Sequence, residues 1–336
     1  MKKILLLLVV LFFSCYCYSQ EIHTFDEILK NMVNSKTKYE VVDFKDPVKR
    51  TDFSNKLNEN IYYRVETGSK IDLKKIDLEG NFVGSFKNAE NYFEKGQYDD
   101  AIENYEKAYK EEPNAHFLLT LIGQCHALKK DFDEAAKYYK LAIKNNYIDY
   151  MAHWFLADIY AGNRNYKDAV REITLASILN RNNPRIFKSL KSIYDNAGIK
   201  WLDFQFTPQM TLQKIKEDSI VISFDLNWLV YAMIKAYWKC EPGYKESMGV
   251  TGDDDLSMVE EREALANEYY SLKKKNTDLK DKPDLLILEK AIEGKMLDEF
   301  IVYEIMLLKH PIAAYTLPKA TLELIADYVI KIRSAK

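Results

Sequence analysis

Side chains that could perform catalysis or hold a metal are scattered along this sequence. The five histidines are His23, His116, His126, His153 and His310. No two of them stand four residues apart, and none pairs with a cysteine or carboxylate at metal-ligand spacing. Cys125 and His126 are adjacent, which places their side chains on different parts of a helix. We predict no histidine-based site and expect His126 to fill an aromatic position between helices.

The densest acidic run is Asp253-Asp254-Asp255. A calcium loop alternates its ligands so that their oxygens converge, whereas three consecutive aspartates splay apart, so we predict a solvated loop. Glu260, Glu261 and Glu263 follow Ser257 and predict the negative first turn of a helix, which the helix dipole favours. The sequence has no glycine-rich phosphate loop and no G-x-S-x-G elbow. We therefore predict no enzyme activity and no cofactor.

The elements that carry these residues repeat along the chain every 34 residues between Ser85 and Gly198. The aligned positions are Tyr98, Phe132 and Tyr166; Ala101, Ala135 and Ala169; Ala108, Ala142 and Ala176; and Tyr92, His126, Tyr160 and Tyr194. A period of roughly 20–50 residues indicates stacked structural units instead of one closed core. We expect this block to form an elongated array of similar units.

Within one unit the small and aromatic residues recur at helical spacing, as at Ala101, Tyr105 and Ala108. Gly96, Lys130-Asp131 and Asn163 mark the turns between helices. Two helices of a hairpin approach to about 8–10 Å, and the closest crossings leave room only for alanine or glycine. The pattern predicts antiparallel helix pairs.

These units resemble the tetratricopeptide repeat, whose motif reads W-x2-L-G-x2-Y, then A-x3-F, then P. The first unit offers Ala89-x2-Tyr92, Ala101-x3-Tyr105 and Pro113, and the second offers Ile122-Gly123-x2-His126 and Ala135-x3-Tyr139. The third offers Leu156-Ala157-x2-Tyr160 and Ala169 with Ile173, and a fourth first-helix carries Phe187, Leu190 and Tyr194. The sequence departs from this motif at His126 and Ile173, which stand where the motif has an aromatic residue, and it lacks the proline after the second unit. The resemblance covers about a third of the chain.

The resemblance implies a concave groove lined by the first helix of each unit, where a protein partner binds. The family's groove positions correspond here to Phe86, Glu90, Phe93, Phe117, Thr120, Gln124, Met151, Trp154 and Asp158. Phe86, Glu90, Met151 and Phe155 replace the basic and amide residues of the subgroup that clamps a chaperone's carboxylates. We expect an apolar or helical peptide instead. Alternatively, the 71–83 segment or a neighbouring helix fills this groove permanently.

The first nineteen residues resemble an export signal of the kind found in Bacteroidota. Lys2 and Lys3 precede the apolar run 4–13, which is too short to span a bilayer. We predict cleavage before Gln20 and a periplasmic or outer-membrane-associated protein. In the alternative, 12–15 acts as a lipobox and Cys15 carries a lipid anchor.

The amino-acid composition argues against nucleic acid as a binding partner. Lys and Arg total 48 against 51 Asp and Glu, so no basic field favours nucleic acid. We also predict no integral membrane span. Cys125 and Cys240 remain after cleavage, and we expect both to be buried as small apolar residues. A disulfide between them stays open as the alternative, since an exported protein meets oxidising conditions.

The sequence therefore predicts a mainly all-α fold: an α-solenoid of tetratricopeptide helical hairpins with a small mixed N-terminal cap and a C-terminal α-helical domain. The predicted divisions are a signal peptide (1–19), a cap segment with a short helix and a hairpin (20–84), three repeats plus a fourth first-helix (85–198), a connector (199–223) and the helical domain (224–336).

Three hypotheses for function follow. The first is an exported scaffold that binds a peptide or helix of an envelope partner in the repeat groove. The second is an enzyme with an unrecognised site in 224–336, which clustered perturbed carboxylates in a deep pocket would favour. The third is a structural subunit of one obligate envelope assembly.

Overall fold

The computed structural model describes residues 22–51, 56–57, 59–68, 70–250 and 257–335. The predicted signal peptide, Cys15 and the run Asp253–Asp255 lie outside them. The chain forms two compact units. One joins the described residues up to Asp46 with Gln209–Leu272, and the other joins Pro47–Pro208 with Lys273–Lys336. The fold is mainly helical, as predicted.

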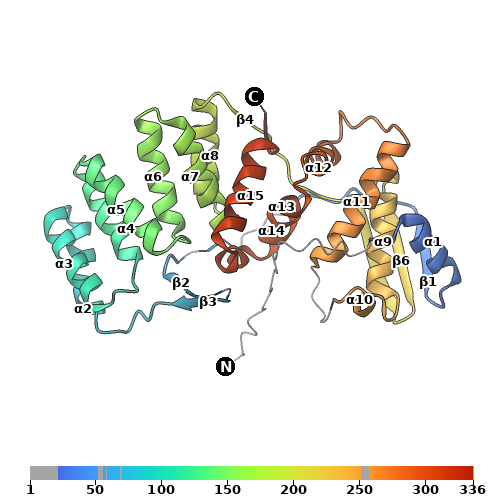
Figure 1. Ribbon diagram of the computed structural model, residues 1–336, viewed down its shortest axis with the longest axis horizontal. Coiled ribbons are helices and arrows are strands. Elements are labelled where there is room, and N and C mark those ends of the chain that lie inside the picture. The colour runs from blue at the N-terminus through green and yellow to red at the C-terminus, as the bar shows by residue number, and fades with distance from the viewer. Residues whose placement is uncertain (1–21, 52–55, 58, 69, 251–256, 336) are drawn as a thin grey trace. The chain divides into compact units, whose positions relative to one another are not determined.

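The larger unit is built on a stack of helical hairpins, drawn from cyan to yellow-green in Figure 1. Its helices are α2 (Val83–Glu94), α3 (Tyr98–Glu111), α4 (Phe117–Leu128), α5 (Phe132–Asn145), α6 (Tyr150–Gly162), α7 (Tyr166–Leu179) and α8 (Pro184–Asn196). Side chains of Asp131 and Asp149 cap α5 and α6 by accepting backbone N–H groups. The predicted solenoid is confirmed.

A left-handed residue ends the first helix of each unit. Gly96, Lys130, Arg164 and Gly198 have φ of 73°, 66°, 59° and 70°, and they stand 34 residues apart. Glycine adopts this conformation without steric cost, whereas lysine and arginine meet some strain there. The same turn therefore recurs in every unit although only two units supply glycine.

Small side chains allow the helices of each pair to touch. All six aligned alanines (101, 135, 169, 108, 142 and 176) are fully buried. Gly123 of α4 lies directly against the ring of Tyr139 on α5, where a Cβ atom would meet the ring at 2.6 Å. The alanine ladders therefore mark close crossings, as the spacing predicted.

An N-terminal segment runs along one edge of the repeats. Its antiparallel hairpin consists of β2 (Tyr62–Thr67) and β3 (Lys70–Lys75), below the helices in Figure 1. The Asn146 side chain donates to the Tyr62 carbonyl at 2.8 Å, and Asn180 both donates to and accepts from the Leu57 backbone. This segment is the small strand cap that the sequence predicted.

The C-terminal part of the larger unit contains α12 (Pro283–Glu293), α13 (Leu297–Ile301), a π-helical turn (Val302–Met306), α14 (Leu307–Lys309), a 3-10 helix (Pro311–Thr316) and α15 (Lys319–Lys331). Helix α15 packs on α7, where Arg171 donates to Asp327 at 2.6 Å and also pairs with Glu323. A short pair of strands, β4 (Lys200–Trp201) and β7 (Ser334–Ala335), ties this part to the end of α8. Part of the predicted helical domain thus packs on the solenoid.

The smaller unit contains α1 (Phe25–Asn34), β1 (Lys38–Val42), β5 (Met210–Lys216), β6 (Ser219–Phe224), a 3-10 turn (Leu226–Trp228), α9 (Leu229–Cys240), α10 (Tyr244–Ser247) and α11 (Met258–Lys274). The strand order is β1-β6-β5, with β1 parallel to β6. Ile220 and Ile222 of β6 pack against Ala232 and Ala236 of α9.

This division differs from the predicted one. The segment predicted as a connector supplies two strands of a sheet, and the predicted helical domain is shared between the two units at residues 272 and 273. The reason is that β6 pairs with a strand about 180 residues earlier in the chain. Such long-range pairing leaves no local signal in the sequence.

Cys125 and Cys240 are both buried free thiols, as the main prediction held. Within the part of the chain that the structure describes, no helix is long and apolar enough to cross a membrane.

Candidate functional site: a groove on the second and third repeats

An apolar groove of about 420 Å³ opens between α4 and α6, with α5 contributing part of its wall. Its lining residues are Gln124, Ala127, Leu128, Phe132, Tyr139, Phe155, Asp158, Ile159, Gly162 and Asn163. First helices of consecutive units lie side by side in a solenoid, so their groove-facing residues meet at intervals of one repeat. Gln124 and Asp158 are such a pair, 34 positions apart.

Aromatic rings form the floor of the groove and apolar side chains form its rim. The rings of Tyr139 and Phe155 lie 5.7 Å apart, and Trp154 lies 5.6 Å beyond Phe155. Leu128 and Phe132 at the mouth are 48% and 51% exposed. Large apolar side chains that remain this exposed beside a concavity are typical of a protein-binding surface.

Asp158 is the only charged residue among those lining the groove. Its side chain is reached by water, yet the surrounding apolar walls disfavour the charged form and raise the pKa of Asp158 to about 6. Burial raises the pKa of the Tyr139 phenol, and the nearby Asp158 carboxylate adds to that rise. The groove therefore combines an apolar floor with a single anionic group.

The cavity brings together some of the groove residues predicted on α4 and α6. Gln124 and Asp158 line the cavity. Trp154 is half-buried and donates its indole N–H to the Ser189 hydroxyl at 2.9 Å, while Met151 is half-buried near the start of α6. Trp154 contributes to the site through its contact with Phe155, not as a free anchor.

The predicted residues on α2 lie outside this cavity. The ring of Phe86 packs edge-on against Phe117 at 5.8 Å, and Phe93 packs on Tyr98. Glu90 accepts a hydrogen bond from the buried Tyr105 hydroxyl. These side chains stabilise the first repeat, and only their half-buried edges face solvent.

Phe117 and Thr120 do not present surface to a partner. Phe117 is 8% exposed and belongs to the core, while Thr120 is 1% exposed and donates to Asp149 at 2.7 Å. Asp149 also accepts from Asn60 and from a backbone amide of α6. The hydroxyl of Thr120 thus supports a helix cap, which corrects its predicted place in the groove.

Sequence reasoning missed the rim of the groove. Phe132 was aligned with Tyr98 and Tyr166 as a repeat position and was not assigned to the groove, yet it is half exposed and lines the cavity. Leu128 and Gly162 are also one repeat apart, and this spacing could have identified both as groove positions. The 71–83 segment does not line the cavity, so it does not fill this part of the groove.

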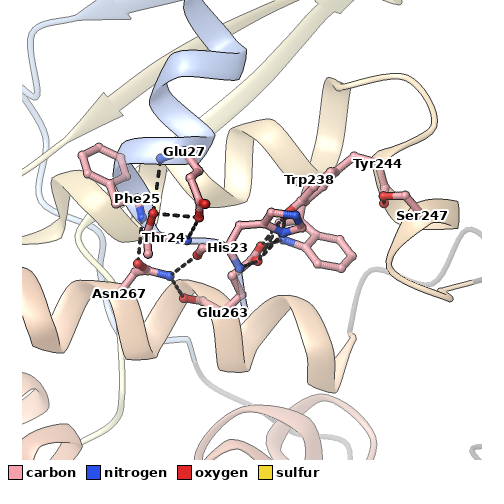
Figure 2. Close-up of polar contacts among 9 residues, drawn as sticks. All are labelled: His23, Thr24, Phe25, Glu27, Trp238, Tyr244, Ser247, Glu263 and Asn267. Atoms are coloured by element: carbon pink, nitrogen blue, oxygen red, sulfur yellow. Dashed lines mark hydrogen bonds and ion pairs between the residues drawn. The ribbon is translucent and has the colours of Figure 1, made fainter. Parts of the chain in front are cut away.

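The smaller unit holds a second concentration of acids, along the face of α11 that meets α9. Figure 2 shows Glu263, which accepts hydrogen bonds from the Trp238 indole at 2.6 Å, the Tyr244 hydroxyl at 2.9 Å and the His23 amide at 3.0 Å. Lys235 lies 2.5 Å from Glu260 and 2.8 Å from Glu261. These acids lie in the predicted first turns of a helix, but they are buried and not solvated.

This acidic cluster is best explained by stability. Each carboxylate is matched by donors from neighbouring elements, which is what buried charges require. Burial raises the pKa of Glu260, although the Lys235 ammonium opposes that change. Among the described residues no group of histidines, cysteines and acids is arranged to hold a metal ion.

Comparisons with known proteins agree with the repeat geometry. Residues 86–146 and 131–184 match the tetratricopeptide repeat family. The hairpins between α2 and α8 are therefore tetratricopeptide repeats. No curated protein sequence matches the chain.

Two solved structures are similar at low identity. One is the first TPR domain of Spaghetti (RPAP3) bound to the HSP90 peptide SRMEEVD, at 21% identity and a TM-score of 0.33, covering 37% of this chain and 97% of that one. The other is Naa15/Naa10 bound to HypK-THB, at 14% identity and a TM-score of 0.31. That match covers 74% of this chain and 34% of the other.

Proposed function

We propose that this protein is an exported interaction scaffold that binds a helix or peptide of an envelope partner in the groove between α4 and α6. The observation that carries the proposal is the open apolar groove with Leu128 and Phe132 exposed at its mouth. An apolar side chain of the partner would enter the groove and pack against Leu128, Phe132 and Phe155. Anchors of this kind dominate the free energy of peptide binding.

The family match supports the choice of a protein partner, since tetratricopeptide arrays present concave surfaces for binding. The groove lacks basic residues, so a partner with clustered carboxylates is disfavoured. Asp158 is the one charged residue among those lining the groove, and its carboxylate would repel an acidic peptide. The partner in our proposal is apolar.

A photo-crosslinking experiment tests the groove. A photoreactive phenylalanine analogue replaces Phe132 in one sample and Leu141 in another, because both are exposed on α5 and only Phe132 lines the groove. We expect a discrete crosslinked partner in envelope preparations from Phe132 alone. Equal crosslinking from both positions, or none from either, would contradict groove binding.

A purified segment of the crosslinked partner then allows a binding measurement. We expect the double variant Leu128→Ser, Phe132→Ser to weaken binding by tenfold or more, and Leu141→Ser to leave it unchanged. Because all three side chains are already exposed, these changes should have small effects on folding.

Export is tested separately by mass spectrometry of the mature chain from a Bacteroidota host. An N-terminus at Gln20 supports cleavage, and an acylated Cys15 supports the lipid-anchored form. An intact Met1 with the protein in the cytoplasmic fraction would overturn export. Sizing of the purified protein tests the obligate-subunit hypothesis, since a stable monomer speaks against it.

A further inference from the structure

The end of the solenoid differs from its middle at one aligned position. Ala89, Gly123 and Ala157 occupy the position where the second helix of a unit approaches most closely. In α8 the aligned residue, 34 positions on, is Lys191. Its long charged side chain prevents such an approach. The chain after α8 is accordingly a strand and an extended segment, 200–206, and not a second helix.

A cavity of about 290 Å³ lies on this face of α8, bounded by the 201–205 segment and Arg333. Its apolar walls are the rings of Phe187, Trp201 and Phe204. Its lining also carries four cationic side chains and one acid. These are Arg50, Arg181, Lys191, Arg333 and Asp203.

Arg333 is held against the aromatic wall. Its guanidinium carbon lies 3.7 Å from the centre of the Phe204 ring and 5.2 Å from that of Trp201, and the side chain is 3% exposed. One of its nitrogens donates to the Phe204 carbonyl. Nε and Nη1 have no hydrogen-bond acceptor among the described residues, although Nη1 lies 3.3 Å from Glu304. These two nitrogens are out of contact with solvent, so Arg333 gives the cavity its positive charge and not a free hydrogen-bond donor.

The fixed acids behind the cavity do not balance its cations. Arg181 lies 3.7 Å from the same Glu304 that faces Arg333, so two buried guanidiniums share one carboxylate. Asp284 is half-buried, accepts the Thr207 amide at 2.8 Å and does not line the cavity, although it lies close enough to interact with Arg333 and Arg50. The cavity therefore presents a net positive field to solvent.

Three of the charged side chains that line the cavity are exposed to solvent. Asp203 lies 2.7 Å from Lys191 and 3.5 Å from Arg50, and these cations hold the pKa of Asp203 below its usual range. All three side chains are about half exposed, so their mutual attraction is weak. An incoming anion could exchange places with Asp203 at little cost.

We infer that this cavity binds a small organic anion, a carboxylate or phosphate joined to a planar apolar body. The ring or chain of the ligand would lie among Phe187, Trp201 and Phe204, and its anionic group would face Lys191, Arg50 and the buried guanidiniums. Arginine suits both anions because its planar fork binds two oxygens at once. A volume near the lower end for ligand pockets limits the ligand to a small molecule.

Calorimetric titration of the purified full chain tests the inference with four probes. Phenyl phosphate and benzoate carry both features, inorganic phosphate carries only the charge, and benzyl alcohol carries only the ring. We expect the first two to bind at least tenfold more tightly than the last two, and more weakly as salt concentration rises. The tighter of phenyl phosphate and benzoate identifies the preferred anionic group.

Lys191→Gln and Arg50→Gln should each weaken phenyl phosphate binding by about tenfold, since both side chains are exposed enough to be replaced without unfolding. Lys188→Gln is the matched control, because Lys188 is exposed on the same helix and does not line the cavity. The inference is overturned if neither anion binds, if benzyl alcohol binds equally, or if all three variants bind like the parent chain. The groove proposal does not depend on this result.

Discussion

The contact between Gly123 and Tyr139 offers the sharpest test of how the repeats pack. Replacing Gly123 by alanine would place a Cβ atom 2.6 Å and 2.8 Å from two carbons of the Tyr139 ring. Tyr139 is 2% exposed, so the ring has little room to withdraw except toward the groove. Overpacking of this kind costs about 1–3 kcal/mol.

The same change also has a favourable part, which must be subtracted. Alanine stabilises a helix interior by about 1 kcal/mol relative to glycine. The net expectation for Gly123→Ala is therefore a loss of roughly 0–2 kcal/mol. Gly84→Ala is the matched control, because nothing lies within 4 Å of its Cβ position. It should stabilise by about 0.4–1 kcal/mol.

The measurement is urea unfolding of both variants and the parent chain, followed by circular dichroism. We expect Gly123→Ala to be less stable than Gly84→Ala by about 0.4–3 kcal/mol. A double-mutant cycle with Tyr139→Leu should show coupling, since the smaller side chain leaves space for the methyl group. If Gly123→Ala proved as stable as the control, the close crossing of α4 and α5 would be refuted.

Three further predictions follow. Asn180→Ala should destabilise the larger unit by about 1–2 kcal/mol, because two partly buried backbone groups of Leu57 lose their partner. Hydrogen exchange at the Leu57 amide should accelerate, and unchanged exchange would contradict the contact. Glu263→Ala should cost about 3 kcal/mol in the smaller unit, since the Trp238 indole would be left as a buried donor without an acceptor and the Tyr244 hydroxyl would keep only His23 as a partner; calorimetric unfolding measures the loss. The pKa of Asp158 is about 6 in the folded chain against an ordinary 3.8, so folding favours its protonated form. The protonated carboxyl's contribution to the free energy of unfolding is fully present below about pH 3.8 and is lost as pH rises through about 6. Asp158→Asn should remove this loss of stability between about pH 3.8 and 6. Parallel pH profiles of unfolding free energy for variant and parent would contradict the raised pKa of Asp158.

The local pattern of residues accounts for the predictions that the structure confirmed. Ala101, Ala135 and Ala169 predict where helices cross because a helical face depends only on spacing within the helix. The turns could be predicted from the sequence for the same reason, since Gly96 and Gly198 favour the left-handed conformation that Lys130 and Arg164 also adopt. The short helix predicted in the cap segment is α1, which begins with a capping box of Thr24 and Glu27.

Only some of the residues that line the groove could be predicted from the sequence. Gln124 and Asp158 followed from the family's groove positions, whereas Phe117 and Thr120 turned inward because the edge segment and Asp149 cover them. Whether a groove stays open depends on what packs above it, and the repeat pattern contains no information about that. The exposed rim at Phe132 shows the same limit.

By itself the sequence determined the helical repeat, its register and the faces of its helices, because these depend on interactions between residues near one another in the chain. Only the tertiary structure decided that β1 pairs with β6, that Glu263 is buried among donors, and that cations gather around the end of α8. Those features join residues that lie far apart in sequence, and their contacts are selected by the packing of the whole chain.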